Sequence, residues 1–328
     1  MELKFDEFKK VLKEPLKRKK KRIQLNESGL STGVRYLDKA LGGILPNDLV
    51  IIGAKTGAGK SELVTSIAMT NALKGKRVHH FALEAEEDEI MDRIIFKQVA
   101  QIYYNSSEYK GAYKKIHLNF LDWSAGKFEK ELNGLEEKIL PELEELLESY
   151  NVFYRSQDFG ILDAMRMILS IKDQTDLIII DHLHYIDFDE ANENKAVADI
   201  TKKIKDLAII SEKPIILVSH LRKMDPRYAG GLPSLEDFHG TSNISKIATK
   251  AIILAPCFDK TKDVRHFYTY MRVLKNRKDG QRSRYTARCI WDVSTNNYLP
   301  NFALGDLSFD GKTYDQITEE EIPIWMKD

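Results

Sequence analysis

Long apolar runs are missing from this sequence, and cysteine is scarce. No apolar run approaches the roughly 20 residues that cross a bilayer, and the N-terminus lacks the apolar core of a signal peptide. The two cysteines, Cys257 and Cys289, have neither the spacing of a metal site nor the number for a disulfide framework. We therefore expect a soluble, cytoplasmic protein with no membrane partner.

An excess of either charge is also missing. The 50 Lys and Arg residues balance 50 Asp and Glu residues. The overall charge therefore gives no reason to expect nucleic acid, and any such site must be a local basic patch. The length of 328 residues suits one large α/β domain or two small ones, and a hydrophobic content of 43% supports a sizeable core.

The strongest motif is the stretch from Ile51 to Leu63, IIGAKTGAGKSEL. An apolar run, a Gly-rich turn and a Lys-Ser pair that opens a second apolar segment are typical of a phosphate-binding loop between a strand and a helix. Glycines let backbone N–H groups converge on phosphate oxygens, and the helix N-terminus favours an anion. Lys60 would reach the β- and γ-phosphates, and the Ser61 hydroxyl would ligate Mg²⁺.

The predicted cofactors are thus ATP and Mg²⁺. The usual pattern has glycine six residues before the lysine, where this chain has alanine. The alternative is a Gly-rich turn that binds nothing, which the preceding strand and the following helix disfavour. The residues predicted to bind the nucleotide are Gly53, Ala54, Lys55, Thr56, Gly57, Ala58, Gly59, Lys60, Ser61 and Glu62.

Two carboxylates follow predicted strands downstream of this loop. A strand over residues 77–83 is followed by Glu84, and the apolar run 177–180 ends in Asp181. Ligands of open parallel sheets lie at the carboxyl ends of the strands, so both acids are expected near Lys60. Asp181 is predicted to lie on the Mg²⁺ side. Glu84 is either the base that deprotonates the attacking water or an exposed acid at a helix start.

Histidines follow two of the predicted strands. His182 and His184 come after Asp181, and His220 ends the strand that begins at residue 214. We find no further ligands with the spacing of a zinc site. His184 is predicted to be a polar sensor near the γ-phosphate, or else a histidine with an ordinary structural hydrogen bond.

Several segments away from these strands are basic, acidic or without a period. Residues 17–22 form a basic run, which is either a solvated arm or a contact for nucleic acid or a neighbouring subunit. An acidic helix is predicted over residues 128–150, with a kink at Pro141, and residues 305–328 are predicted to be an irregular acidic tail. A helix is predicted over residues 244–250. Strands over residues 266–274 and 285–291 form a hairpin with a basic tip.

Taken in order, the motifs resemble the ATPase domain of the DnaB-type hexameric replicative helicases. A lead-in over residues 32–45 also looks like that family, and the resemblance covers roughly residues 23–300. Any single motif is weak, but the ordered series is specific. Besides the phosphate-binding loop, it consists of Phe81-Ala82-Leu83-Glu84, Ile179-Ile180-Asp181-His182-Leu183-His184, Val218-Ser219-His220-Leu221, Asp237-Phe238-His239-Gly240-Thr241-Ser242 and Lys275-Asn276-Arg277-Lys278-Asp279-Gly280.

The resemblance implies catalytic roles for specific residues. Lys60 and Ser61 would bind phosphate and metal, Glu84 would be the catalytic base, and Asp181 would be the acid on the Mg²⁺ side. Lys275 and Arg277, at the hairpin tip, are similar to the basic pair that a neighbouring subunit sends into the ATP site. The alternative for this tip is simple solvation.

The segment 222–243 resembles the loop that lines the central channel of the family and grips single-stranded DNA. The chain departs from the family where His184 and His220 replace Gln and where His239 replaces Arg. The two replaced glutamines are the family's sensors, and this chain would use the two histidines there. The predicted DNA-binding residues are Arg222, Lys223, Arg227, His239, Gly240, Thr241 and Ser242.

The fold expected from the resemblance is a RecA-like α/β domain over residues 25–328, with a mostly parallel central sheet flanked by helices and a C-terminal β-hairpin. It would contain a helical insert at about 102–150, and residues 1–24 would form a helix and basic arm that docks on the next subunit. The implied function is ATP-dependent movement of a hexameric ring along single-stranded DNA to unwind duplex during replication, with a helicase loader or primase as a possible partner. The alternatives are a RecA/RadA-like recombinase and a KaiC-like switching ATPase, because fold alone does not decide function.

Overall fold

The computed structural model describes thirteen segments of the chain. These are residues 17, 19–20, 29–86, 88–105, 116–155, 159–186, 193–221, 232–238, 246–257, 259, 261–280, 284–308 and 311–327. The predicted boundary at residue 25 and most of the predicted N-terminal helix and basic arm lie outside these residues.

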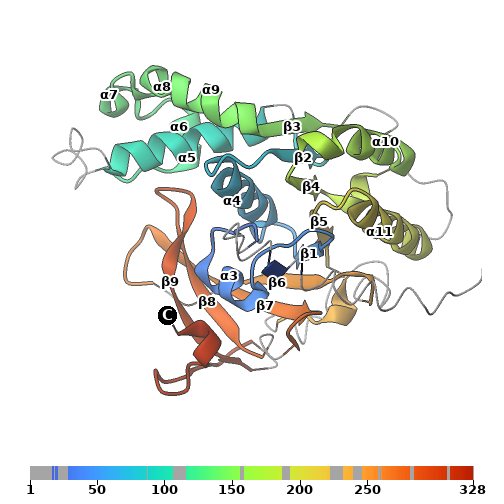
Figure 1. Ribbon diagram of the computed structural model, residues 1–328. Coiled ribbons are helices and arrows are strands. Elements are labelled where there is room, and N and C mark those ends of the chain that lie inside the picture. Colours follow the sequence, from blue (N-terminus) through green and yellow to red (C-terminus); the bar gives the residue numbers. More distant parts are fainter. Residues whose placement is uncertain are drawn as a thin grey trace, which may run out of the picture.

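A ten-stranded sheet organises the described residues (Figure 1). Its strand order is β10-β9-β8-β7-β6-β1-β5-β4-β2-β3. The parallel strands are β1 (Leu49–Ala54), β2 (Val78–Ala82), β3 (Tyr150–Tyr154), β4 (Leu177–Asp181), β5 (Ile215–His220) and β6 (Lys250–Pro256). The antiparallel strands are β7 (His266–Asn276), β8 (Thr286–Asp292), β9 (Asn297–Leu307) and β10 (Tyr314–Gln316).

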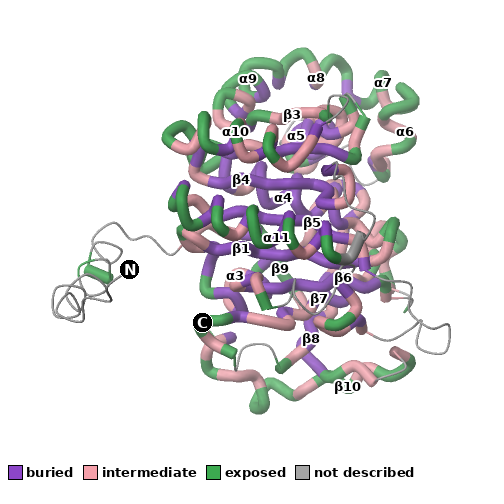
Figure 2. The backbone as a smooth tube through the Cα atoms, turned by 90° about the vertical axis from the view of Figure 1, so that its right-hand side faces the viewer, coloured by how far each residue is buried: buried purple, intermediate pink, exposed green. Residues whose placement is uncertain are grey.

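The central parallel strands are buried on both faces, as their continuous apolar sequences predict. In β1, Val50 and Ile52 belong to one core cluster, whereas Leu49 and Ile51 belong to the other. The strands β4 and β5 alternate between the same two clusters. Figure 2 shows these strands as buried layers across the middle of the molecule.

Helices cover both faces of this sheet, and their positions in Figure 1 agree with the two core clusters. The first face carries α3 (Arg35–Leu41), α4 (Lys60–Ala72) and α5 (Glu89–Asn105). The second face carries α10 (Ile161–Ile171) and α11 (Glu193–Ile210). The prediction of a mostly parallel sheet flanked by helices is confirmed.

The predicted single helix over residues 128–150 is wrong. After α6 (Phe120–Ser124), the structure has three short helices: α7 (Glu129–Leu132), α8 (Leu135–Lys138) and α9 (Leu140–Ser149). Asn133 and Gly134 separate the first two because both have positive φ, at 46° and 72°. Pro141 lies in the first turn of α9, where proline starts a helix and does not kink it.

The C-terminal region contains more strand than the predicted hairpin and irregular tail. The strands β9 and β10 extend the hairpin to four antiparallel strands. Pro300 hides β9 in the sequence, because proline cannot donate to a sheet, and the structure accommodates it where the β8–β9 register shifts between Cys289 and Trp291. Gly305 permits the close approach of β10, since an added Cβ there would lie 2.5 Å from the Asp315 carbonyl oxygen.

The predicted helix over residues 244–250 is also wrong at its end. Lys250 begins β6 and is buried. Its Nζ lies 2.7 Å from the Asp48 carboxylate and donates a hydrogen bond to the Gly43 carbonyl oxygen at 2.5 Å. This buried ion pair ties the start of β6 to the turn before β1.

Candidate nucleotide-binding site

The Gly-rich loop connects the carboxyl end of β1 to the N-terminus of α4. Gly57 and Gly59 have φ values of 77° and 84°, and open space surrounds both. Their backbone conformation therefore requires glycine, and no side chain blocks the approach of a ligand. Gly53 is required for a different reason, which is the lack of space. It lies within β1, and an added Cβ there would lie 2.5 Å from the Phe238 ring.

The helix α4 is held firmly behind this loop. It is buried on most of its surface and contacts β4, α5 and α9. A helix fixed in this way presents its first backbone N–H groups and the positive end of its dipole to the loop. The loop and helix together form a cradle whose geometry suits an anion.

Lys60 provides the buried cation of this cradle. Its Nζ donates hydrogen bonds to the carbonyl oxygens of Ala54 at 3.3 Å and Lys55 at 3.2 Å, so the loop's own backbone holds the side chain in place. Burial lowers the pKa of Lys60, while the nearby carboxylates of Glu84 and Asp181 raise it. A phosphate group would replace neutral carbonyl partners with charged ones, which strengthens the hydrogen bonds.

Asp181 ends β4 next to Ser61, as the sequence predicts. Burial raises the pKa of Asp181 to about 6, with a contribution from the Glu84 charge, while a hydrogen bond from Ser61 opposes this shift. Its Oδ1 is buried and has no hydrogen-bond partner among the described residues. A buried carboxylate oxygen beside a hydroxyl is the oxygen donor set that Mg²⁺ prefers, so these two residues fit the expected metal.

Glu84 lies beside Asp181 because β2 and β4 are neighbours. The N–H groups of Leu83 and Glu84 donate to the Asp181 carbonyl oxygen at 2.5 Å and 3.3 Å, which continues the β2–β4 pairing past the end of β2. The Glu84 side chain is 35% exposed. It is therefore accessible to water at the carboxyl edge of the sheet.

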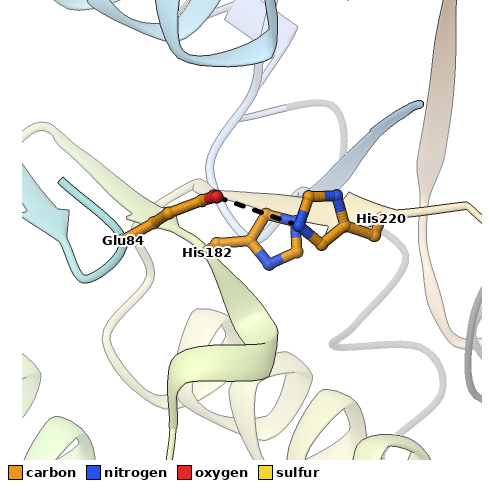
Figure 3. Close-up of side chains that lie close together, drawn as sticks. All are labelled: Glu84, His182 and His220. Carbon is orange, nitrogen blue, oxygen red and sulfur yellow. Dashed lines mark ion pairs between the residues drawn. The ribbon is translucent and has the colours of Figure 1, made fainter. Parts of the chain in front are cut away.

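Two histidines, His182 and His220, lie close to Glu84, and His184 packs beside them. His220 Nε2 lies 4.0 Å from Glu84 Oε1. The ring of His182 lies between its neighbours, with its centroid 3.8 Å from that of His220 and 5.1 Å from that of His184. Figure 3 shows the Glu84 carboxylate and the rings of His182 and His220 converging. The sequence shows no further ligands with the spacing of a zinc site, and the structure brings Glu84 and His220 to His182 from other strands.

A cavity of about 430 Å³ opens beside the Gly-rich loop. Gly57, Ala58, Gly59 and Glu62 line its loop side. The other side consists of the C-terminal strands and includes four aromatic side chains: Phe267, Tyr268, Trp291 and Tyr298. These four aromatic residues were not predicted from the sequence. The only sequence signal for them is that aromatic residues recur along the strands of the C-terminal hairpin.

The carboxylate of Glu62 points away from the loop into an ionic network. It accepts a hydrogen bond from Arg93 Nε at 2.7 Å, lies 3.1 Å from Lys97 Nζ and accepts from Asn296 Nδ2 at 3.2 Å. Lys97 is buried and also donates to the Asn296 carbonyl oxygen. The side chain of Glu62 thus joins α4 and α5 to the turn before β9.

Lys275 and Arg277 lie at the opposite edge of the sheet from Lys60. Lys275 pairs with Ala251 near the start of β6, and the Arg277 N–H donates to the Thr249 carbonyl oxygen just before that strand. A six-residue strand such as β1 is about 17 Å long. The two edges are therefore too far apart for either side chain to reach the loop of its own chain. Lys275 Nζ and Arg277 Nη2 both donate to the Lys246 carbonyl oxygen instead.

The predicted DNA-binding residues, Arg222, Lys223, Arg227, His239, Gly240, Thr241 and Ser242, all lie outside the described residues. The described flanks meet where Leu221 forms an antiparallel bridge with Phe238. Both flanks are thus anchored at the carboxyl end of β5. None of the described helices has the length and apolar character needed to cross a membrane.

Comparison with known proteins identifies the family. Residues 29–287 match the family model described as "DnaB-like helicase C terminal domain". The chain is 23% identical over 226 residues to the replicative DNA helicase DnaB of Buchnera aphidicola subsp. Schizaphis graminum, covering 67% of this chain and 45% of that protein. It is 28% identical over 243 residues to a probable plasmid replicative DNA helicase of Chlamydia muridarum, covering 70% and 49%. The chain therefore spans about half the length of the curated relatives it matches.

Two solved structures share the fold. One, described as an ATPase domain, superposes with a TM-score of 0.69 at 17% identity, covering 88% of this chain and 98% of that one. A DnaB-like replicative helicase, whose structure was described with its interactions with primase, superposes with a TM-score of 0.62 at 16% identity, covering 87% and 66%. The RecA-like fold class is thereby confirmed. Because the family model covers most of the chain, this protein belongs to the DnaB-like helicase C-terminal domain family.

Proposed function

We propose that this chain is the ATP-hydrolysing motor of a ring-forming DNA helicase that acts in replication. One observation carries the proposal: Lys60, Ser61, Asp181 and Glu84 come from three separate segments but meet at the carboxyl edge of the parallel sheet. This combination of cation, hydroxyl and two carboxylates is the set that phosphoryl transfer to water needs. Membership of the family and the names of its replicative relatives support the same activity.

Each of these residues has a distinct task in the proposed hydrolysis. The N–H groups of the Gly-rich loop and Lys60 hold the β- and γ-phosphates. Ser61 and Asp181 hold Mg²⁺, which neutralises charge on the phosphate oxygens. Glu84 accepts a proton from the water that attacks the γ-phosphorus, so the P–O bond to ADP breaks as the new P–O bond forms.

The aromatic cavity is proposed to receive the adenine base. It adjoins the loop and contains Phe267 and Tyr268 from β7 and Trp291 from β8. Aromatic faces stack on bases, and stacking contributes about 1–3 kcal/mol per base. Because Phe267 is 59% exposed, a large part of its ring is open to a ligand.

The position of Arg277 supports an assembly of subunits. Its side chain cannot reach the loop of its own chain, yet a cation there would stabilise the charge of the transferring phosphoryl group in a neighbour. Subunits repeating head to tail would bring each Arg277 to the next Lys60, and such a heterologous contact closes into a ring when its rotation permits. A hexamer is the proposed closure, with ATP between subunits.

Coupling to DNA is proposed to run through His220. This residue lies beside Glu84, and only Leu221 separates it from the segment 222–243, which is predicted to contact single-stranded DNA. A change of charge at the γ-phosphate would therefore act close to the predicted DNA-binding segment. A loader or primase is a further proposed partner, in line with the primase interactions described for one structural neighbour.

The test is unwinding of a forked DNA duplex with ATP and Mg²⁺, with the Lys60→Ala protein as control. We expect strand separation by the unaltered protein and none by the variant. ATPase activity without unwinding, and without stimulation by single-stranded DNA, would contradict the helicase proposal and favour a switching ATPase. Strand pairing in place of separation would favour a recombinase.

A further inference from the structure

Glu84, His182 and His220 form a cluster at the ends of three adjacent strands. Glu84 follows β2, His182 follows β4 and His220 ends β5, which are neighbours in the order β5-β4-β2. One ligand atom from each residue lies within 4.8 Å of the other two. Figure 3 shows how the three side chains approach one another.

His182 is the buried member of this cluster. Its side chain has 0% exposure, and its Nε2 has no hydrogen-bond partner among the described residues. A buried polar atom without a partner costs about 1–3 kcal/mol. A neutral imidazole has one ring-nitrogen lone pair that can bind a metal ion.

We propose that Glu84, His182 and His220 bind a transition-metal dication of the zinc type, at a site separate from the Mg²⁺ position of Ser61 and Asp181. Two imidazoles and one carboxylate are a common catalytic zinc donor set, whereas Mg²⁺ prefers oxygen ligands only. Ligand atoms around a tetrahedral ion lie about 3.4 Å apart when each metal–ligand distance is about 2.1 Å. The 4.0 Å between His220 Nε2 and Glu84 Oε1 is close to this value, and both side chains are partly exposed and can adjust their positions.

Binding at His182 Nε2 requires a change of tautomer. Its Nδ1 accepts a hydrogen bond from the His184 backbone N–H at 3.4 Å, which places the ring proton on Nε2 in the metal-free protein. A metal at Nε2 moves that proton to Nδ1 and breaks this contact. The loss is small because 3.4 Å lies beyond the usual range of such bonds.

Occupation of this site would switch off hydrolysis. A carboxylate bound to a metal cannot accept a proton from the attacking water, so Glu84 would be withdrawn from its task. This consequence rests on the proposed function of Glu84, whereas the binding of the metal does not. Free transition metal would then inhibit the enzyme reversibly, even when Mg²⁺ and ATP are saturating.

Binding is tested by adding Co²⁺ to the full chain without nucleotide and in the presence of millimolar Mg²⁺. We expect the visible absorption bands of tetrahedral Co²⁺ to reach a plateau at one ion per chain and to disappear when Zn²⁺ is added. His182→Asn and His220→Gln should each weaken binding at least about tenfold. The matched control is His79→Gln, on β2 five residues before Glu84, which should bind as the unaltered chain does.

Circular dichroism shows which variants fold. If His182→Asn does not fold, His220→Gln is the decisive variant, because His220 is partly exposed and its replacement should not disturb the fold. Absence of the bands in the unaltered chain, or bands that persist unchanged in His220→Gln, would overturn the proposed site.

For the switch, Zn²⁺ should inhibit the ATPase of the unaltered chain and a chelator should restore the activity. Inhibition of the residual ATPase of His220→Gln should need a Zn²⁺ concentration at least about tenfold higher. If Co²⁺ binds but Zn²⁺ does not inhibit the ATPase, the inhibitory role of the site is wrong and the site itself stands. If the unaltered chain has no Mg²⁺-dependent ATPase activity, the proposed function is wrong, and the Co²⁺ result still decides whether the metal site exists.

Discussion

The two edges of the parallel sheet differ in how they hold their charged residues. At the carboxyl edge, Lys60 and Asp181 are buried and fixed by short contacts to their own loop and to Ser61. At the amino edge, Arg277 is exposed, and its guanidinium donates to the Lys246 carbonyl oxygen. The first edge is pre-organised for a ligand within the chain, whereas the second presents a cation outward. This difference between the edges is the basis of our proposal that a nucleotide site is completed between two subunits.

The amino edge also contains a cation that is buried within the fold, Lys250. Lys250 is buried against Asp48 and the Gly43 carbonyl oxygen, and it holds the start of β6 to the turn before β1. Arg277 lies close to it along the same edge, next to Thr249. Burial thus separates Lys250 from Arg277, the exposed cation that we propose to reach a neighbouring subunit.

The largest predicted effect is that of Arg277→Ala. We expect the assembled protein to lose about 10³-fold or more in ATPase rate, because the transferring phosphoryl group loses its cation. Binding of ATP to the chain should change little. Lys278→Ala, at the next position, is the control, and a fully active Arg277→Ala assembly would contradict the role of this edge.

Glu84→Gln tests the other edge. We expect a loss of about 10²–10⁴ in turnover, since the amide cannot accept a proton from water. ATP binding, measured with a fluorescent analogue, should be retained. The control is Glu86→Gln, an exposed acid two residues away, and normal turnover by Glu84→Gln would exclude this residue as the base.

Lys250→Met tests the structural cation of the amino edge. Removal of Lys250 leaves Asp48 buried without its ion-pair partner, which destabilises a fold by about 3–5 kcal/mol. The measurement is the free energy of unfolding in urea, with the exposed Lys246→Met as control. A change below about 1 kcal/mol would show that the burial of this pair does not matter to the fold.

Phe267→Ala should have the smallest effect. We expect the KM for ATP to rise about tenfold with little change in kcat, because a base would lose one stacking surface remote from the reacting atoms. Val264→Ala, an exposed apolar side chain before the same strand, is the control. An unchanged KM would place the base outside the aromatic cavity.

Much of the carboxyl edge could be predicted from the sequence. The pattern around Lys60 is local, and parallel strands bring Asp181 and Glu84 to the same edge whatever their order. The histidine cluster could not be predicted, because it depends on β2, β4 and β5 being neighbours. Two errors have local causes, because Asn133 and Gly134 interrupt a helical pattern and Pro300 conceals a strand. The third has a distant cause, because Lys250 pairs with Asp48, which lies 202 residues away in the sequence.

The central claim is that one nucleotide site is built from two chains, and mixing two inactive variants tests it most directly. Lys60→Ala keeps Arg277 but loses its own phosphate site, and Arg277→Ala does the reverse. In an equal mixture, about one quarter of the head-to-tail interfaces would combine an intact loop with an intact arginine. The account predicts that ATPase activity returns on mixing, although neither variant is active alone. A mixture as inactive as its two components, in assemblies shown by native mass spectrometry to contain both chains, would contradict it.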